Sequence, residues 1–542
     1  MSEIQFDTIS GGIRKPGVHF EFNTRLAVNT LPGNEQRVLV IGPMLSGGTA
    51  TPLNAVSVYS EDEADVYFGA GSLAAAMARA AINANSYLQL DVIGIADSGA
   101  GKAATGAVTV SGTATSSGTL SVWVAGEQVT VDVETGDEPS KIIPALVEAM
   151  TQTPSLLVTG EYQSEASQLT VTTRTKGAWG NDITLSASTT AGGLTVSATP
   201  MANGEMDPDI QPALDAVFAA GHNILICPFS TTPALAALKQ HLEKTGNAME
   251  QRGAIGCAGW TGSLGNGITL AAGVNSGRVS IPWYRGSVKL PAVLAAIYGA
   301  VMAGEEDPAR PLNSLALSGL DVVAMSQRES RNEQENALHN GLTPVEVGPG
   351  NTVQIVRAVS TYTVNAQGVT DVSLLDITSI RTLDYTRKAC RERISLRFPR
   401  EKLSTRTIAK VESELYDVLI KLEEAEILEN VEANKAKLRV QRNGKDANRL
   451  DCVVPADVVN GLHVFAGRID MIDISVSAVI PDTNEPDWEN LEGVKISIYP
   501  LSNSGKRTSY LDCFTVEVGE KYTVDSEAKI DIKMAALRKV TG

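Results

Sequence analysis

The sequence predicts a multidomain protein of mixed α/β and α+β class, in which a layered α/β domain carries an inserted β-rich domain. Short all-apolar runs alternate with helical segments over residues 37–97 and again over residues 203–375, which is typical of a sheet covered on both faces. Between them, residues 98–202 are rich in Thr, Ser, Val and Gly and alternate apolar with polar positions, as short strands do. The length of 542 residues also exceeds what one core normally holds.

The composition excludes several classes of protein. Apolar residues make up 43% of the chain and charged residues 20%, which is typical of globular domains. The net charge of −17 argues against a broad nucleic-acid footprint. Five scattered cysteines form no disulfide framework and no cysteine zinc site, which fits a reducing compartment. We find no signal-like or membrane-spanning run, so we expect no membrane contact and folding in the cytoplasm of the producing cell.

Residues 1–36 predict an extended N-terminal arm. They are punctuated by Gly and Pro, and residues 13–28 alternate apolar with polar side chains as a strand does. Because this segment precedes any core, we expect it to pair with something outside itself.

Residues 37–97 and 203–375 together predict one α/β domain with a mostly parallel sheet, interrupted by the insertion of residues 98–202. The segments assigned to strands are residues 38–41, 88–96, 223–227, 253–258 and 278–282. The helical segments are residues 61–68, 72–83, 210–220, 232–247, 264–272 and 289–304. The insertion holds one helix, residues 139–150, and its 9 acidic and 4 basic residues indicate a solvated outer domain.

Residues 376–474 predict an α+β domain in which a basic helical stretch precedes an acidic one. Residues 381–410 carry 10 basic and 3 acidic side chains, whereas residues 411–432 carry 1 basic and 8 acidic. The apolar face of the acidic helix consists of Val411, Leu415, Val418, Leu419, Leu422 and Ile427. The charge switch gives the chain two complementary patches, and the alternative is local ion pairing on solvated faces.

Residues 475–542 predict a β-rich C-terminal extension. Its alternating runs are typical of strands, and we expect a short helix ending in AALRKV at residues 535–540.

No catalytic, cofactor-binding or metal-binding motif is found, so we expect a protein that is not an enzyme and uses no cofactor. At and just before the run SGAGKAATG of residues 98–106, Ala96 and Ala103 stand where a phosphate-binding loop needs Gly and Ser or Thr. The five histidines lack metal-ligand spacing, and His241 is expected on an exposed helix position. No G-x-S-x-G elbow occurs.

Two other function classes stay open on the residues alone. A hydrolase with a dispersed Ser, His and Asp needs no local motif. A glycan-binding adhesin needs exposed aromatic side chains, for which the insertion offers Trp123, Trp179 and Tyr162.

Four stretches resemble the tail sheath proteins of contractile-tailed bacteriophages, most closely the Mu-like branch. They are KGAWGNDI at residues 176–183 and the segments at residues 290–320, 374–404 and 446–471, which include the Asp-Pro-Ala-Arg-Pro loop and the Phe-Pro-Arg element. The resemblance covers nearly all of residues 1–474 through the order and spacing of these elements.

This resemblance implies a structural subunit that forms hexameric rings stacked helically around a tail tube. It implies a subtilisin-like α/β domain, a conserved inner sheath domain at residues 376–474, and chain ends that add strands to sheets of neighbouring subunits. It implies contraction during DNA ejection, a place in the virion after assembly in the host cytoplasm, and baseplate and tail terminator proteins as further partners. A phage-tail-like bacteriocin sheath is the alternative within this class.

We assign contact residues on this basis. The predicted inter-subunit arm residues are Val18, Phe20, Phe22, Leu462, Val464 and Ile469. The predicted contacts to the tube or to neighbours are Glu412, Glu414, Glu423, Glu424, Glu426, Arg387 and Arg391. For the strands, ordinary pairing within the domain is the alternative. Sheath chains of this branch usually end near the equivalent of residues 468–472, so the extension forms either a decoration or a repositioned C-terminal arm.

Overall fold

The computed structural model describes residues 31–468, 472–479, 487–490, 492–498, 508–519, 522–524 and 527–541. The chain divides into two compact units, Met1–His463 and Val464–Gly542, and each is described by itself below. The predicted arm of residues 1–30 lies outside the described residues. The finer domain boundaries given above stay predictions.

A six-stranded sheet forms the centre of the first unit, in the order β13-β12-β11-β1-β3-β2. Its strands are β1 (Arg37–Pro43), β2 (Ala55–Ser57), β3 (Gln89–Ile95), β11 (Ile224–Ile226), β12 (Ile255–Cys257) and β13 (Val279–Ser280). All of them run parallel except β2, which pairs antiparallel with β3 at the edge. This confirms the predicted mixed α/β class.

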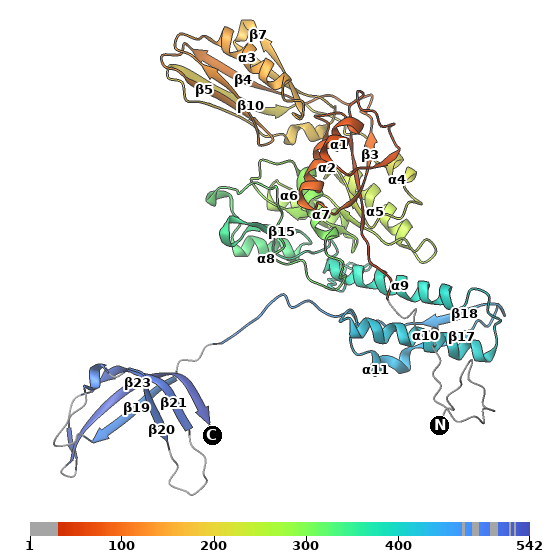
Figure 1. Ribbon diagram of the computed structural model, residues 1–542, viewed down its shortest axis with the longest axis vertical. Helices are drawn as coiled ribbons and strands as arrows, with labels where there is room; N and C mark the ends of the chain where they lie inside the picture. The colour runs from red at the N-terminus through yellow and green to blue at the C-terminus, as the bar shows by residue number, and fades with distance from the viewer. Residues whose placement is uncertain are drawn as a thin grey trace, which may run out of the picture. The chain divides into compact units, whose positions relative to one another are not determined.

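Helices pack beside this sheet, as Figure 1 shows for α2, α5 and α7. They are α1 (Glu61–Phe68), α2 (Leu73–Ala84), α4 (Gln211–Ala216), α5 (Thr232–Gly246), α6 (Leu264–Val274) and α7 (Pro291–Ala303). A serine side chain caps α1, α2 and α6; Ser72, for example, accepts a hydrogen bond from the Ala75 N–H. Helices α4, α5 and α7 instead have a proline in the first turn. Helix α7 is buried almost all round, which accounts for its nearly continuous apolar sequence.

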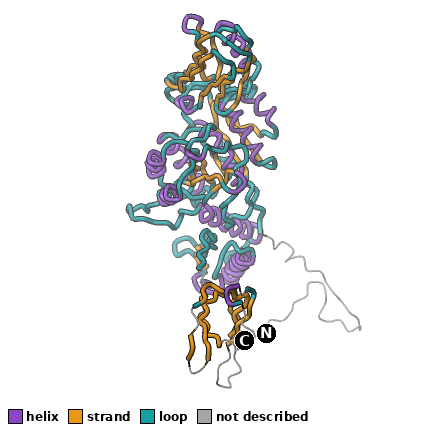
Figure 2. Tube along the Cα trace, turned by 90° about the vertical axis from the view of Figure 1, so that its left-hand side faces the viewer, coloured by secondary structure: helices purple, strands orange, loops and turns teal. Residues whose placement is uncertain are grey.

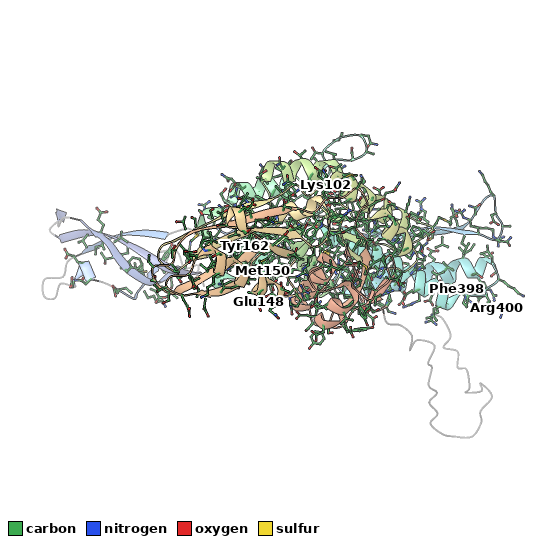
Figure 3. All side chains as sticks on the ribbon, turned by 90° about the horizontal axis from the view of Figure 1, so that it is seen from above. Lys102, Glu148, Met150, Tyr162, Phe398 and Arg400 are labelled. Carbon is green, nitrogen blue, oxygen red and sulfur yellow. The ribbon has the colours of Figure 1, made fainter. Side chains whose placement is uncertain are left out.

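Residues 98–202 fold as two antiparallel sheets with one helix, and strands dominate this region in Figure 2. The sheets are β10-β4-β8-β7 and β6-β5-β9. The elements are β4 (Thr105–Gly112), β5 (Gly118–Val124), β6 (Glu127–Val133), α3 (Pro139–Thr151), β7 (Val158–Gln163), β8 (Gln168–Thr173), β9 (Leu185–Thr189) and β10 (Leu194–Ala202). Lys102, labelled in Figure 3, pairs with Glu205 at 2.7 Å, where the two connections to the α/β domain meet.

A smaller three-stranded sheet, β14-β15-β16, completes the α/β region. Its elements are β14 (Pro282–Trp283), β15 (Thr343–Val347) and β16 (Val353–Ile355), and α8 (Arg331–His339) precedes β15.

Two long helices and a two-stranded sheet follow, and they lie together in Figure 1. The elements are α9 (Ile377–Arg397), α10 (Thr405–Glu424), α11 (Val431–Asn434), β17 (Arg439–Arg442) and β18 (Leu450–Val453). Val411, Leu415, Val418, Leu419 and Leu422 are buried on α10, which confirms their helical spacing. Ile427 is also buried, but it lies beyond the end of this helix at Glu424. Ser404 caps α10, so the basic-to-acidic switch near residue 411 falls inside this helix instead of between two helices.

The second unit is a five-stranded antiparallel sheet. Its strands are β19 (Ile472–Val479), β20 (Val494–Ile498), β21 (Thr508–Val518), β22 (Tyr522–Val524) and β23 (Glu527–Thr541). The predicted helix at residues 535–540 is wrong, because these residues belong to β23. That strand pairs with both β19 and β21, and its residues Ile532, Met534 and Ala536 are buried at a period of two.

A second correction concerns His241. It is buried, with 6% of its surface exposed, and its ring packs edge-on against Phe218 at 6.0 Å. Burial lowers the pKa of His241 to about 4. Separately, none of the helices among the described residues combines the length and the apolar character needed to span a membrane.

Candidate subunit interface

The sheet formed by β17 and β18 has two unpaired outer edges among the described residues. The strands pair antiparallel from Arg439 with Val453 to Arg442 with Leu450, and no other described strand joins them. An edge strand exposes N–H and C=O groups that another chain can pair with. A two-stranded sheet is also marginal by itself and gains stability from further strands. These edges are therefore a candidate site for strand addition.

An apolar cleft of about 490 Å³ lies between this sheet and the two long helices. Ile394 and Phe398 of α9 and Val411 and Leu415 of α10 line it, together with Leu450 of β18. Figure 3 labels Phe398 and Arg400 at the end of α9. Alternate residues of an added strand would face this cleft, because successive side chains of a strand point to opposite sides.

The predicted arm residues divide between the described and the remaining parts of the chain. Val18, Phe20, Phe22 and Ile469 lie outside the described residues. Leu462 and Val464 belong to no strand, and they are 80% and 76% exposed. The neighbouring Phe465 is 88% exposed. Three large apolar side chains thus face solvent within four consecutive positions, which is unusual for a segment with no partner.

The predicted acidic contacts do not share one environment. Glu412, Glu424 and Glu426 are exposed. Glu414, in contrast, accepts a hydrogen bond from the Arg393 guanidinium at 3.0 Å. Glu423 accepts one from the backbone N–H of Val431 at 2.8 Å. The exposed three are the ones whose charge is available to a partner.

Some of the basic side chains of α9 form ion pairs with acidic side chains of α10, so these charges are used within the chain. Burial works against the charge of Arg393, but hydrogen bonds to Asp417 and Glu414 outweigh it and raise the pKa of Arg393. Burial likewise opposes the charge of Asp417, but Lys421 and Arg393 lower its pKa below the usual value. The local pairing considered as an alternative therefore operates inside the chain at these positions.

The predicted basic contacts, Arg387 and Arg391, lie on α9 at a polar cleft of about 310 Å³. Arg387 donates to the Gly246 carbonyl at 2.8 Å and to Asp384 at 2.8 Å. Arg391 is exposed and donates to the Gln251 carbonyl at 3.4 Å. Helix α9 thus brings these two together, about one turn apart on one face, whereas the acidic contacts lie on α10 and after it.

One arrangement of Ser, His and Asp occurs, but its order does not suit a hydrolase. Ser57 donates to Asp91 at 2.6 Å, and His222 lies 2.9 Å from the other carboxylate oxygen. The hydrogen bond from His222 holds the pKa of Asp91 well below its usual range. A triad needs the histidine between the serine and the carboxylate, whereas here the carboxylate lies between them.

Neither metal ligation nor a sugar platform is apparent in the parts of the chain that the structure describes. No three His, Cys, Asp or Glu side chains converge there. The aromatic residues of the insertion are not exposed platforms, because Trp179 is buried and Trp123 and Tyr162 are half-buried.

The β17–β18 sheet is the candidate feature that the sequence-based prediction missed. Asn443-Gly444 between two short alternating runs is a hairpin signal that could have found it. The intervening loop is longer than a tight turn, with Asn443 accepting backbone hydrogen bonds from Lys445 and Asp446.

Comparisons with known proteins match most of the chain. The model of the phage tail sheath protein central domain matches residues 204–361, and that of the phage tail sheath C-terminal domain matches residues 369–472. The Mu-like prophage FluMu tail sheath protein of Haemophilus influenzae is 31% identical over 487 residues, which cover 86% of this chain and 99% of that protein.

Two solved structures are also similar. A sheath tail protein from Desulfitobacterium hafniense has a TM-score of 0.47 and 15% identity, covering 82% of this chain and 97% of its own. One from Listeria innocua has a TM-score of 0.46 and 14% identity, covering 80% and 94%. Residues 98–202 and 473–542 lie outside both family-model matches.

Proposed function

This chain belongs to the phage tail sheath family, and from that premise we propose that it polymerises as stacked hexameric rings around a tail tube. Contraction of this lattice drives the tube through the host envelope during DNA ejection. The subunit is a structural protein of the virion, assembled in the host cytoplasm, and it has no catalytic role and no cofactor. Its partners are other copies of itself, the tail tube protein, and the baseplate and tail terminator proteins. Its α/β domain has a subtilisin-like topology.

Strand addition is the proposed means of linking subunits. The observation that carries it is the two-stranded sheet with open edges beside an apolar cleft. Backbone hydrogen bonds to an added strand provide affinity, and side chains entering the cleft provide specificity. Residues 18–22 and 462–469 supply the strands. Full burial of a side chain such as Leu462 or Phe465 contributes about 1.5–3 kcal/mol.

The proposed mechanism of contraction needs no hydrolysis. An extended lattice that is metastable relative to a shorter and wider one releases its stored free energy once the baseplate triggers it. Strand links survive the change, because a donated strand moves with the sheet that receives it while its connecting segment turns. The subunit bodies can therefore exchange their other contacts without separating.

Electron microscopy of negatively stained protein, alone and with tail tubes, tests this function. We expect hollow striated cylinders. Compact monomers that persist under both conditions at high protein concentration contradict the proposal.

A further inference from the structure

Six cationic side chains surround the polar cleft beside α9. The cleft of about 310 Å³ lies between residues 34–37, the loop at residues 251–255 and one face of α9. The cations are Arg37, Arg252, Arg381, Arg387, Lys388 and Arg391. Two acidic residues, Glu35 and Asp384, also line it. The lining therefore carries more positive than negative charge, although the whole chain is strongly acidic.

Most of the acidic groups near the cleft already have cationic partners. Both oxygens of Asp384 accept from Arg278, at 2.6 and 2.9 Å, and one also accepts from Arg387. Arg37 pairs with Asp91, and Arg252 pairs with Glu250. Glu35 is exposed to solvent. Glu35 is thus the one carboxylate of the lining without an ion pair among the described residues, and the six cations outnumber it.

Three of the cations contact only neutral oxygens among the described residues. Arg381 donates to the carbonyl of Glu305, Lys388 to that of Gly33, and Arg391 to Gln251. Of the three, Arg381 most needs a partner for its charge, because only 7% of its surface is exposed. Glu305 and Asp307 lie near enough to favour its charge, but neither forms an ion pair with Arg381 among the described residues. A charge buried to this extent normally has a directly paired counter-ion, since leaving it unpaired costs several kcal/mol.

Two of the arginines that line the cleft also have a guanidinium N–H group without a hydrogen-bond acceptor in the described part of the chain. They are Nη1 of Arg381 and Nε of Arg252, both shielded from solvent. Buried donors nearly always have partners. A cleft whose lining has donors without acceptors and more cations than carboxylates has the chemistry of an anion site, and guanidinium groups suit planar or tetrahedral oxyanions.

We propose that this cleft is an oxyanion site, which holds a phosphate or carboxylate group against Arg381, Lys388 and Arg391. The carboxylate source is an acidic side chain of a second copy of this chain, and in that case the inference rests on the proposed function. The phosphate source is a free ion. Pro32 and Gly33 cross the same face of α9, where their carbonyls accept from Tyr385 and Lys388. A bound anion therefore lies next to the last residues of the N-terminal arm.

Isothermal titration calorimetry on the full-length protein tests the site, at a low concentration that keeps it monomeric. Inorganic phosphate is titrated in one arm and a synthetic peptide of residues 421–432 of this chain in the other. We expect saturable binding of at least one probe, weakened about tenfold by Lys388→Gln or Arg391→Gln. Arg331→Gln, an exposed arginine of α8, serves as the matched control and leaves binding unchanged.

The outcomes separate the two sources. Binding of phosphate alone identifies a free anion, whereas peptide binding that phosphate displaces identifies a carboxylate of a second copy. Absence of binding to both probes overturns the proposal, and so does binding that is unchanged in both cleft variants. Arg381→Gln adds a stronger test if circular dichroism shows that it folds. Because the measurement uses monomers, its failure is distinct from a failure to form sheaths.

Discussion

Arg393 of α9 donates a hydrogen bond through Nη1 to Oδ2 of Asp417 in α10 at 2.7 Å. The same nitrogen lies 3.0 Å from Glu414. Only 5% of the Arg393 side chain is exposed, so this cation depends on its two carboxylate partners. The contact joins the two helices that line the candidate interface, and Glu414 is one of the residues predicted to contact the tube or a neighbour.

Replacing Arg393 should loosen the pairing of α9 and α10. In Arg393→Gln two carboxylates lose their shared partner, although Asp417 keeps Lys421 and Glu414 keeps Arg397. Losing the hydrogen bonds to these charged groups costs about 1.5–3 kcal/mol. Hydrogen exchange of α10 amides, followed by mass spectrometry, measures the effect locally, which suits a multidomain chain. Arg400→Gln, at an exposed position beyond the end of α9, is the control. Equal protection of α10 in the two variants contradicts this account.

Gly259 should not tolerate even a methyl group. A Cβ at this position would lie 2.0 Å from the backbone carbonyl oxygen of Pro291, where α7 begins. The Cβ is fixed by the backbone of Gly259, and the oxygen that it meets belongs to the backbone at Pro291, so neither atom can move without shifting the chain. Gly259→Ala should therefore lower the free energy of unfolding by about 3 kcal/mol.

The matched control is Gly273→Ala in α6, where an added Cβ meets nothing within 4 Å. This change should stabilise the protein by about 0.5–1 kcal/mol, because Ala favours helix. Differential scanning calorimetry of both variants measures the two effects, which are opposite in sign. A Gly259→Ala variant as stable as the parent contradicts the close approach.

His241 should make the first unit sensitive to acid. Burial lowers its pKa to about 4, whereas an unfolded histidine has a pKa near 6.5. Between these values the unfolded state binds the extra proton, so stability is complete above pH 6.5 and is lost as the pH falls towards 4. One such group changes the free energy of unfolding by at most about 1.4 kcal/mol per pH unit.

Thermal unfolding from pH 7 to pH 4 measures this effect. His241→Leu should flatten the pH dependence, and His339→Leu, at an exposed position at the end of α8, should leave it as in the parent. An unchanged slope in His241→Leu means that another group titrates in this range.

Local hydrophobic patterns in the sequence predicted the helices and strands far better than the contacts between them. Val411, Leu415 and Val418 repeat with helical spacing, and all three are buried on α10. The segment AALRKV, rich in helix formers, forms part of β23, because pairing with two neighbouring strands overrides weak intrinsic propensity.

The candidate site depended on relationships that no local pattern encodes. Asp384 binds Arg278, which lies 106 positions earlier in the chain. His241 looked like a surface residue because its burial comes from packing against Phe218 of another segment. The partners of Leu462 and Val464 belong, in our proposal, to another chain, so a single sequence cannot specify them.

Reversing exposed acidic charges near the end of α10 should weaken assembly. Glu424 and Glu426 are exposed, and no ion pair engages them among the described residues. In the proposed function they face the tube or a neighbouring subunit, so the double change Glu424→Lys and Glu426→Lys replaces attraction by repulsion. Glu423 is left unchanged because it accepts the Val431 N–H.

Sedimentation of assembled sheaths at physiological salt measures this effect, and we expect at least a tenfold loss of assembled material. The same double reversal at Glu161 and Glu165, two exposed acids of the insertion, is the control. Equal assembly by both variants would show that the acidic end of α10 makes no contact on which assembly depends.

Deleting most of the N-terminal arm, residues 1–24, should abolish long sheaths and leave a folded monomer. Deletion of residues 1–24 retains Pro32 and Gly33, whose carbonyls accept hydrogen bonds from Tyr385 and Lys388. All described contacts of the first unit are therefore preserved, whereas Val18, Phe20 and Phe22 are lost. Electron microscopy measures sheath length, and circular dichroism checks the fold.

A second variant tests the other proposed strand without any deletion. Changing Leu462, Val464 and Phe465 to Asn removes the exposed apolar side chains, which make no core contact in the isolated chain. The monomer should therefore keep its stability while assembly fails. The control changes the exposed Tyr87 and Met249 to Asn and should assemble normally. Sheaths of parental length from both arm variants contradict strand addition, whereas loss in only one identifies which end of the chain is donated.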